Sequence, residues 1–362
     1  MTKKITLSIL TIFLLNASFA QTKITGSVDG YYRYNFNDAT FDNPTGVTHF
    51  GNNYTSFTNS QNTFQLGMAS VKFEHTMGKV GGVADLGFGP KAEEFSYADK
   101  NTLLAVKQAY VYYSVSDKVK FTFGKFGTHI GYELLDPQLN KNYSMSYMFT
   151  NGPFSHTGLK ADFTLGKGAG IMVGVANPID QTAPTDGNAP KTLIAQVSKT
   201  FTKGSIYLNY AGYFGAKESM PTASSLNQIG LTASYNATDK VGLGLDATIQ
   251  THKDEVADKS KSWYGVALYG SYAASSAFTL ALRAEYFGDK YGTKITGAGA
   301  DGGNNVLGVT LSGNYKVGGL TFIPEIRLDN SSEDGMFAKK DGTTLSATKS
   351  SVSAILAAVY SF

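Results

Sequence analysis

Apolar and polar residues alternate with a period of two along most of the chain. Between residues 276 and 289, for example, Phe278, Leu280 and Leu282 alternate with a face that carries Arg283 and Glu285. Successive side chains of a β-strand point to opposite sides, so this pattern predicts strands with one apolar and one polar face. It predicts sixteen strands, at residues 23–36, 62–77, 80–89, 103–116, 119–127, 156–165, 170–177, 191–202, 204–214, 226–236, 240–251, 262–274, 276–288, 304–317, 319–329 and 350–362.

The connections between these strands are short and long in turn. Short turns fall at residues 78–79, 117–118, 166–169, 203–204, 238–239, 275 and 318, and long loops at 37–61, 90–102, 128–155, 178–190, 215–225, 252–261, 289–303 and 330–349. This sorting is typical of transmembrane barrels, which have short periplasmic turns and long extracellular loops. In hydrocarbon every backbone N–H and C=O group needs an internal partner, so such a sheet has to close on itself. We therefore expect an all-β fold, a closed antiparallel transmembrane β-barrel of about 16 strands, within limits of about 14 and 18.

The first twenty residues have the pattern of a cleaved secretory signal peptide. Lys3 and Lys4 precede an apolar stretch at residues 5–15, and Ser18 and Ala20 supply small residues for cleavage after Ala20. The apolar stretch is shorter than the roughly 20 residues that a transmembrane helix needs. No linker or appended module interrupts the later pattern, so residues 21–362 are expected to form a single outer-membrane β-barrel domain.

Composition and charge exclude several classes of function. Charged residues make up 16% of the chain, whereas typical globular proteins have roughly 25%. The formal net charge of +3 offers no strongly basic surface, so no nucleic-acid partner is expected. The chain has no cysteine, and its five histidines show no metal-binding spacing. We expect no metal, no cofactor and no catalytic residues.

Several stretches carry a family resemblance. They are residues 24–34 (ITGSVDGYYRY), 66–74 (LGMASVKFE), 83–89 (VADLGFG), 107–113 (KQAYVYY), 123–136 (FGKFGTHIGYELLD) and 142–160 (NYSMSYMFTNGPFSHTGLK). These stretches resemble the OmpL-like β-barrel porins of Gram-negative bacteria, especially the Bacteroidetes. The resemblance is dense over residues 23–180 and weaker beyond. It implies an outer-membrane location and a passive channel for small hydrophilic solutes or ions, and it supplies no ligand residues.

Charged residues on the polar faces are the candidates for a pore wall, because barrels of roughly 16–18 strands leave an aqueous channel. Both signs occur, and opposite charges across a water-filled lumen would set up a transverse field. Any single member could instead be an ordinary solvated residue paired with a neighbour across strands. The predicted pore-lining residues are Arg33, Asp85, Lys120, Lys160, Asp162, Asp246, Arg283, Glu285, Glu325 and Arg327.

The connection at residues 128–155 is unusually rich in aromatic residues for a solvated loop, which predicts that it packs against something. We expect it to fold into the lumen as a constriction loop, with Glu133, Asp136, Asn140 and Lys141 near the narrowest point. The alternative is that the loop caps the barrel or packs on a neighbouring subunit.

Aromatic residues at strand ends are expected to form girdles at the two membrane interfaces. The candidates are Tyr31, Tyr32, Tyr34, Tyr110, Tyr112, Tyr113, Tyr286, Phe287 and Tyr360. The last strand ends in an aromatic residue, Phe362, which is the feature that the barrel assembly machinery reads in outer-membrane proteins. Outer-membrane lipid, lipopolysaccharide and small hydrophilic solutes are the other expected partners, and a homotrimer is compatible with a barrel of this size.

Two other functions compete with a porin. A surface receptor or scaffold would hold a partner in the long loops at residues 37–61 and 128–155, with the lumen occluded. A lipid-modifying enzyme would need a Ser–His dyad at the barrel rim, and the chain has no GxSxG motif. Conductance of the purified barrel discriminates the porin from the receptor, and loss of lipid hydrolysis on mutating a rim His or Ser would identify the enzyme.

Overall fold

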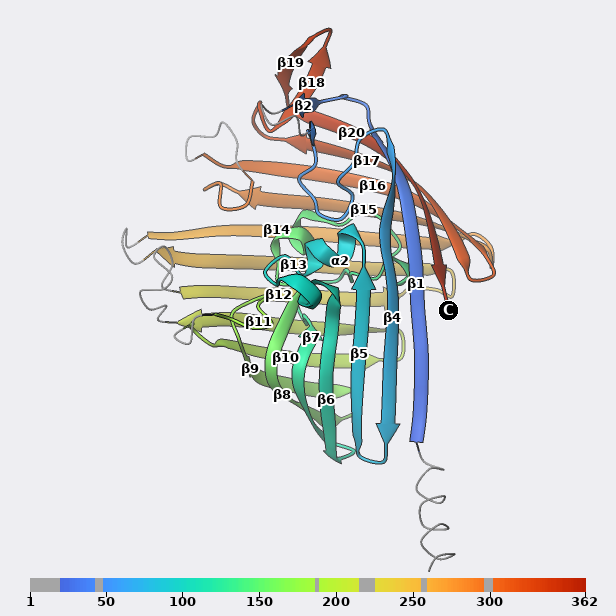
Figure 1. Ribbon diagram of the computed structural model, residues 1–362, viewed down its shortest axis with the longest axis vertical. Helices are drawn as coiled ribbons and strands as arrows, with labels where there is room; N and C mark the ends of the chain where they lie inside the picture. The colour runs from blue at the N-terminus through green and yellow to red at the C-terminus, as the bar shows by residue number, and fades with distance from the viewer. Residues whose placement is uncertain (1–19, 43–47, 186–188, 215–224, 255–258, 296–301) are drawn as a thin grey trace, which may run out of the picture.

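A computed structural model describes residues 20–42, 48–185, 189–214, 225–254, 259–295 and 302–362 of the chain. The predicted signal peptide lies outside these described residues, except for Ala20, which begins the first strand. Sixteen strands form one closed antiparallel barrel (Figure 1), as the alternating pattern predicts.

The barrel strands follow the chain order around the circumference. They are β1 (Ala20–Asn35), β4 (Thr63–Met77), β5 (Val80–Phe88), β6 (Val106–Ser116), β7 (Val119–Gly127), β8 (Ser155–Gly166), β9 (Ala169–Ala176), β10 (Thr192–Phe201), β11 (Gly204–Phe214), β12 (Ser225–Asn236), β13 (Val241–Asp254), β14 (Lys259–Ala273), β15 (Phe278–Asp289), β16 (Asn304–Val317), β17 (Leu320–Ser331) and β20 (Ser350–Ser361). Each overlaps one predicted strand. β13 and β14 run further than expected, so most of the predicted loop at residues 252–261 is strand.

The barrel closes where its first strand meets its last. β1 pairs with β4 on one side and with β20 on the other. The carboxyl-terminal residue completes this seam, because the backbone N–H and C=O groups of Gly26 and Phe362 bond to each other, at 3.0 Å in both directions. No strand edge is left open in this sheet, as a membrane requires.

The two faces of each strand have opposite character. On β17 the side chains of Ile326 and Leu328 point outward and are exposed, whereas those of Glu325 and Arg327 point inward and are buried. This is the expected arrangement for an outer surface in lipid and an interior that is polar.

The expectation of aromatic girdles is wrong for four of its nine residues. Tyr31 and Phe287 are buried in the interior, in contact with other aromatic rings. Tyr110 and Tyr112 alternate with the exposed Val111 and therefore also face inward. Position near a strand end does not decide which face a residue takes, because the direction follows the parity of its position along the strand.

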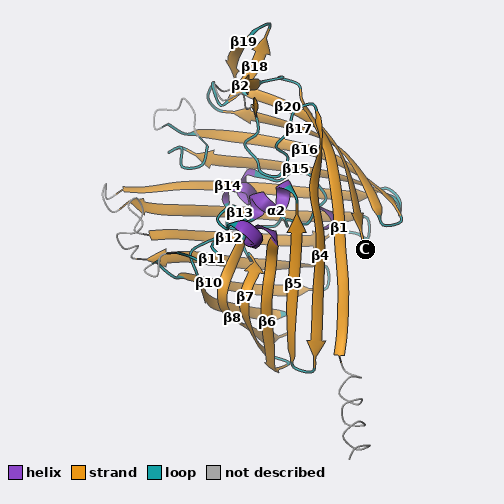
Figure 2. Cartoon of the chain, in the orientation of Figure 1, coloured by secondary structure: helices purple, strands orange, loops and turns teal. Residues whose placement is uncertain are grey.

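Short elements in the long connections fill part of the interior. Figure 2 shows the helices surrounded by the ring of strands. The helices are α2 (Pro90–Phe95), η1 (Asn101–Ala105), η2 (Pro137–Leu139) and α3 (Tyr147–Asn151). Two small hairpins lie in the first and last connections. The first pairs β2 (Thr40–Asp42) with β3 (Thr48–Phe50), and the second pairs β18 (Phe337–Asp341) with β19 (Thr344–Thr348). Within the described ranges, no helix has the length and apolar character needed to span a membrane.

Apolar clusters occupy the end of the interior nearer the long connections. One cluster, which we call the upper cluster, contains Tyr147, Met148, Trp263, Ala267, Phe287, Ile295, Val306, Met336 and Phe337. A second cluster contains Phe57, Met68, Ala92, Phe95, Leu135, Met145, Phe149 and Phe154. Residues from five connections meet the inward faces of the strands in these clusters, so the extracellular half of the barrel is packed with side chains.

Candidate functional site

The connection between β7 and β8, residues 128–154, crosses the barrel interior. We call it the inward segment. On its far side the Asn142 amide donates to the Ser312 hydroxyl of β16 at 2.7 Å, and the Tyr143 hydroxyl donates to the Asp29 carboxylate of β1 at 2.6 Å. In the strand order β16 lies opposite β8, and β1 is separated from β7 by β4, β5 and β6. The segment therefore spans the lumen.

Carboxylates on the barrel wall accept hydrogen bonds from the backbone of the inward segment. Glu325 accepts from the N–H groups of Tyr143 (2.7 Å) and Ser144 (3.1 Å), and Glu285 accepts from that of Tyr147 (2.8 Å). Asp246 accepts from the Tyr132 N–H at 3.1 Å. A buried N–H group without an acceptor is costly, so these carboxylates compensate for the irregular backbone of the segment.

Two buried arginines supply the complementary donors. The Arg283 guanidinium donates to the Glu133 carboxylate at 2.5 Å and to the Ser144 carbonyl at 2.6 Å. The Arg327 guanidinium donates to the Met145 carbonyl at 2.6 Å and to the Asp329 carboxylate at 2.8 Å. Charge-assisted bonds of this kind are stronger than neutral ones and tolerate burial because both charges are paired.

Five of the ten predicted wall residues thus converge on the inward segment. They are Asp246, Arg283, Glu285, Glu325 and Arg327, and all are at most 4% exposed. Their inward orientation follows from the alternating pattern. Their burial does not, because it depends on the segment that covers them.

The other five predicted wall residues lie elsewhere on the inner face. Arg33 is buried and donates to the Ser60 carbonyl at 2.7 Å, and Asp85 is buried in an ion pair with Lys107 at 3.1 Å. Lys160 and Asp162 form a partly exposed ion pair at 3.4 Å. Lys120 is exposed near the turn end of β7, 5.9 Å from the centre of the Tyr112 ring.

The four predicted constriction residues have four different environments. Glu133 is buried against Arg283, and the Asp136 carboxylate is 2.5 Å from the Lys107 ammonium group. Burial raises the pKa of Asp136, and the ion pair with Lys107 opposes this rise.

Asn140 and Lys141 lie at the turn of the inward segment. The Asn140 amide accepts from the N–H group of Leu134 at 3.0 Å and donates to its carbonyl at 2.5 Å, so it braces the turn. The Lys141 side chain is exposed. Its carbonyl accepts from the Asn314 amide of β16 at 2.9 Å.

Sequence reasoning missed several charged residues that anchor the loops. Lys91 of α2 is buried 3.1 Å from the Asp29 carboxylate and 3.8 Å from the centre of the Tyr143 ring. Lys125 of β7 pairs with Asp99 at 2.8 Å. Asp29 shares the inward parity of Arg33 on β1, so the period-two pattern could have identified it. No sequence pattern singles out Lys91, because its partner is distant along the chain.

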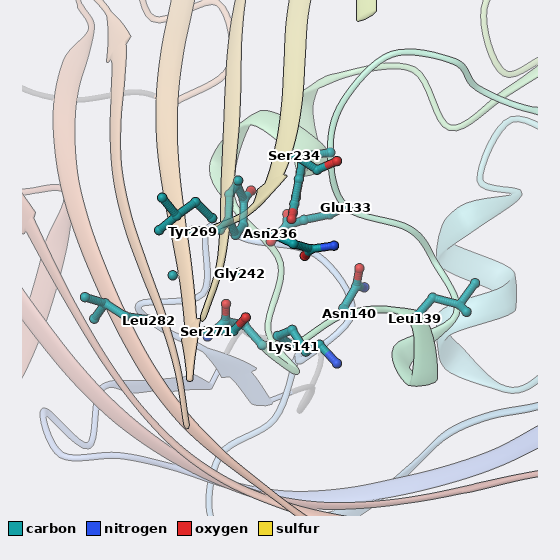
Figure 3. Close-up of a pocket in the computed structure, with 15 residues that line it drawn as sticks. Glu133, Leu139, Asn140, Lys141, Ser234, Asn236, Gly242, Tyr269, Ser271 and Leu282 are labelled. Carbon is teal, nitrogen blue, oxygen red and sulfur yellow. The ribbon is translucent and has the colours of Figure 1, made fainter. Parts of the chain in front are cut away.

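Among the described residues, two sizeable cavities lie beside the inward segment. One, of about 340 Å³, lies between the segment and β12, β13 and β14 (Figure 3), with Tyr132, Asn140, Ser234 and Tyr269 among its lining residues. The other, of about 610 Å³, lies on the β4–β6 side and includes Lys72, Asp85, Lys107 and Asp136. Both reach strand positions near the short turns, in the periplasmic half of the barrel, and the larger one also reaches Phe95, Phe149 and Phe154 of the second cluster.

The comparisons with known proteins agree with this architecture. Residues 21–362 match the family described as "Putative beta-barrel porin-2, OmpL-like". No curated protein sequence matches the chain.

Solved structures of outer-membrane proteins share the fold at low sequence identity. OmpT of Vibrio cholerae is 12% identical with a TM-score of 0.58, covering 95% of this chain and 98% of that one. DcaP, an outer membrane channel of Acinetobacter baumannii, is 16% identical with a TM-score of 0.59 and the same coverages. An anion-selective porin from Comamonas acidovorans is 12% identical with a TM-score of 0.60, covering 95% and 100%. With its family match over the whole barrel, the chain belongs to the OmpL-like β-barrel porins and is a porin of the Gram-negative outer membrane.

Proposed function

We propose that this porin is a passive diffusion channel for small hydrophilic solutes, and that the inward segment sets the narrowest part of its lumen. The observation that carries the proposal is the set of contacts by which Arg283, Glu285 and Glu325 hold the segment across the interior. The segment is fixed at both ends and on its far side, and space is left along its flanks. The two cavities beside it supply that space in the periplasmic half.

The predicted wall charges divide between two roles in this proposal. Arg33, Asp85, Asp246, Arg283, Glu285, Glu325 and Arg327 fix the loops that shape the lumen, together with Glu133, Asp136 and Asn140. Lys120, Lys160, Asp162 and Lys141 remain in contact with water and set the charge that a solute meets. The seven wall residues of the first set are at most 4% exposed, whereas Lys120 and Lys141 are exposed and Lys160 and Asp162 are partly exposed, which supports the division.

The test is single-channel conductance of the purified, heat-modifiable barrel in a planar bilayer. Stable steps that grow when residues 134–144 are deleted are expected, because the deletion removes the part of the segment bonded to β1, β16 and β17. A deletion of residues 341–344, at the exposed tip of the β18–β19 hairpin, is the control and should leave the steps unchanged. Silence from a correctly inserted wild-type barrel would exclude the open channel.

A surface receptor with an occluded lumen is the second candidate, and the apolar packing of the extracellular half favours it. Trp263 and Phe287 stack at 5.2 Å between ring centres in the upper cluster, beside Phe337 from the last connection. Apolar side chains packed across a channel mouth exclude water and ions. A folded barrel without conductance would support this function.

We further propose that the barrel performs no lipid chemistry. Its histidine rings, within the part of the chain that the structure describes, bond to Thr22, Thr128, Gln250 and the Tyr210 carbonyl, and none to a serine hydroxyl. A Ser–His dyad needs that contact. Unchanged phospholipid in vesicles that contain the barrel is the expected result.

We also propose that residues 1–20 are removed as a signal peptide, and that the barrel assembly machinery, lipopolysaccharide and further copies of the chain are partners. The start of the family match at residue 21 supports removal of residues 1–20, which amino-terminal sequencing of the mature protein tests. The seam between Gly26 and Phe362 supports recognition of the terminal strand by the assembly machinery. One solved form of Vibrio cholerae OmpT is a trimer, which supports a homotrimer here, and lipopolysaccharide would contact the outer loops.

A further inference from the structure

The smaller of these two cavities is lined mainly by uncharged residues. It is bounded by Tyr132 and Asn140 of the inward segment and by Ser234, Asn236, Tyr269 and Ser271 of β12–β14. Figure 3 shows side chains from the inward segment and from these strands around the cavity. We call this cavity the tyrosine vestibule.

An aromatic pair forms one side of the vestibule. The rings of Tyr132 and Tyr269 stack with centres 4.3 Å apart and planes inclined by 22°. Tyr132 is held in place because its N–H donates to Asp246, and because Gly244 leaves room for the phenol. A Cβ at Gly244 would lie 2.5 Å from the Tyr132 hydroxyl oxygen. The aromatic surface is therefore fixed before any solute arrives.

Polar groups without formal charge complete the strand side of the wall. Ser234, Asn236 and Ser271 offer hydroxyl and amide groups, which both donate and accept hydrogen bonds. Two charged residues, Glu133 and Lys141, also line the cavity; the Glu133 carboxylate is paired with the Arg283 guanidinium at 2.5 Å, and the Lys141 side chain is exposed. The buried hydroxyl oxygen of Tyr269 has no hydrogen-bond partner among the described residues.

The larger cavity, on the β4–β6 side, has a more highly charged wall than the tyrosine vestibule. Lys23, Lys72 and Lys107 line it together with Asp85 and Asp136, so charged groups of both signs face that space. A charged solute finds complementary groups there. An uncharged solute with many hydroxyl groups is better matched to the vestibule, where hydroxyls and amides bond to it and the tyrosines pack against its C–H face.

We propose that the tyrosine vestibule binds an uncharged, hydroxyl-rich solute of monosaccharide size, such as a hexose or a polyol. A volume of about 340 Å³ lies at the lower end of the range of roughly 300–1,000 Å³ for small-molecule pockets. The inference deepens the proposed channel function by giving the class of solute, and it rests on that function for the solute's route. Binding itself can be measured without conductance.

The experiment is calorimetric titration of the folded full-length barrel with D-glucose in detergent, beside conductance measurements on the same preparation. Tyr269→Leu removes the aromatic face and is expected to weaken glucose binding by about two- to tenfold, the usual range for one aromatic contact. Tyr269→Phe keeps the ring and should bind glucose nearly as wild type does. Tyr112→Leu, an inward tyrosine on β6 outside the vestibule, is the matched control and should bind normally.

Absence of glucose binding by a conducting wild-type barrel would overturn the inference and leave the channel intact. Binding that Tyr269→Leu abolishes in a silent barrel would support the vestibule and contradict the channel. Equal losses in Tyr269→Leu and Tyr112→Leu would also overturn it. If Tyr269→Leu fails to fold, Ser271→Trp fills the vestibule from β14, and unchanged glucose binding by that variant would count against the site.

Discussion

Single carboxylates hold the connections of this barrel together, each by accepting hydrogen bonds from backbone N–H groups. Asp180, in the connection between β9 and β10, accepts from the N–H groups of Phe154 at 2.7 Å and Ser155 at 2.8 Å, and from the Tyr97 hydroxyl at 3.1 Å. It therefore joins three connections at the end of the inward segment. Its side chain is buried, with 2% of its surface exposed.

Burial raises the pKa of Asp180 to about 6, above the ordinary value of about 3.9. The folded protein then holds this proton more tightly than the unfolded chain, so the stabilisation is complete below about pH 4 and is lost as the pH rises through about 6. Asp180→Asn keeps one oxygen that can accept from the N–H groups of Phe154 and Ser155, and it removes the titration. The free energy of unfolding of wild type minus that of the variant should fall by up to about 3 kcal/mol across this window. Urea unfolding at a series of pH values measures it, and a flat difference would contradict the prediction.

At the scale of elements, the seam between β1 and β20 depends on a missing side chain. A Cβ at Gly26 would lie 2.5 Å from the Ser70 carbonyl oxygen of β4 and 2.6 Å from the Phe362 ring. The glycine thus lets the terminal aromatic ring lie over β1 while β1 keeps its pairing with β4. Three strands meet at this one position.

Gly26→Val is expected to reduce closure of the barrel, because the added side chain must displace both a backbone carbonyl and the terminal ring. Overpacking of this kind costs about 1–3 kcal/mol. The folded fraction is read from the heat-modifiable band on a gel after refolding in detergent. Gly270→Val of β14 is the matched control, since a Cβ there meets nothing within 4 Å. Equal folded fractions for the two variants would refute the role of Gly26.

At the scale of the whole molecule, the first and last connections pack against each other at the extracellular end of the barrel. The last connection contributes Met336 and Phe337 to the upper cluster, and Tyr54 of the first connection packs edge-on against Phe337 at 5.6 Å between ring centres. Asn52 bonds to both backbone groups of Ala338, at 2.7 and 2.8 Å. The β18–β19 hairpin is therefore anchored to the interior through its first residues.

Deletion of residues 336–348 should raise single-channel conductance, because it removes two apolar side chains from the upper cluster and opens the space above Trp263. The comparison is with deletion of residues 341–344, which leaves Met336 and Phe337 in place. In a planar bilayer, we expect the single-channel conductance steps to be larger than those of wild type for the deletion of residues 336–348 only. If both deletions conduct like wild type, the inward segment alone limits the current.

The strand pattern could be predicted from the sequence to within a few residues at most ends. Alternation is local, and it specifies both the strand and the face that each side chain takes. The inward direction of Arg283, Glu285, Glu325 and Arg327 followed from it. The expectation that Tyr31 and Phe287 belong to the girdles rested on their position near strand ends. Their place in the alternation along the strand would have predicted that both point inward.

The candidate site was predictable only in part. The aromatic content of residues 128–155 indicated packing, but the partners of Glu133 and Asp136 could not be foreseen. Arg283 lies 150 residues from Glu133 along the chain, and Lys107 lies 29 residues from Asp136. Such pairs form only once the folded barrel has placed the inward segment beside β6 and β15.

The sequence by itself determined that the chain is a closed barrel with short turns at one end and long connections at the other. Each strand has its own alternation of apolar and polar residues, and a sheet in hydrocarbon has to close into a barrel because its backbone groups need partners. Only the tertiary structure decided which inward charges meet water and which are buried under a connection. Glu325 accepts from the backbone of Tyr143, 182 residues away, and a contact at that distance depends on where the whole chain places the two groups.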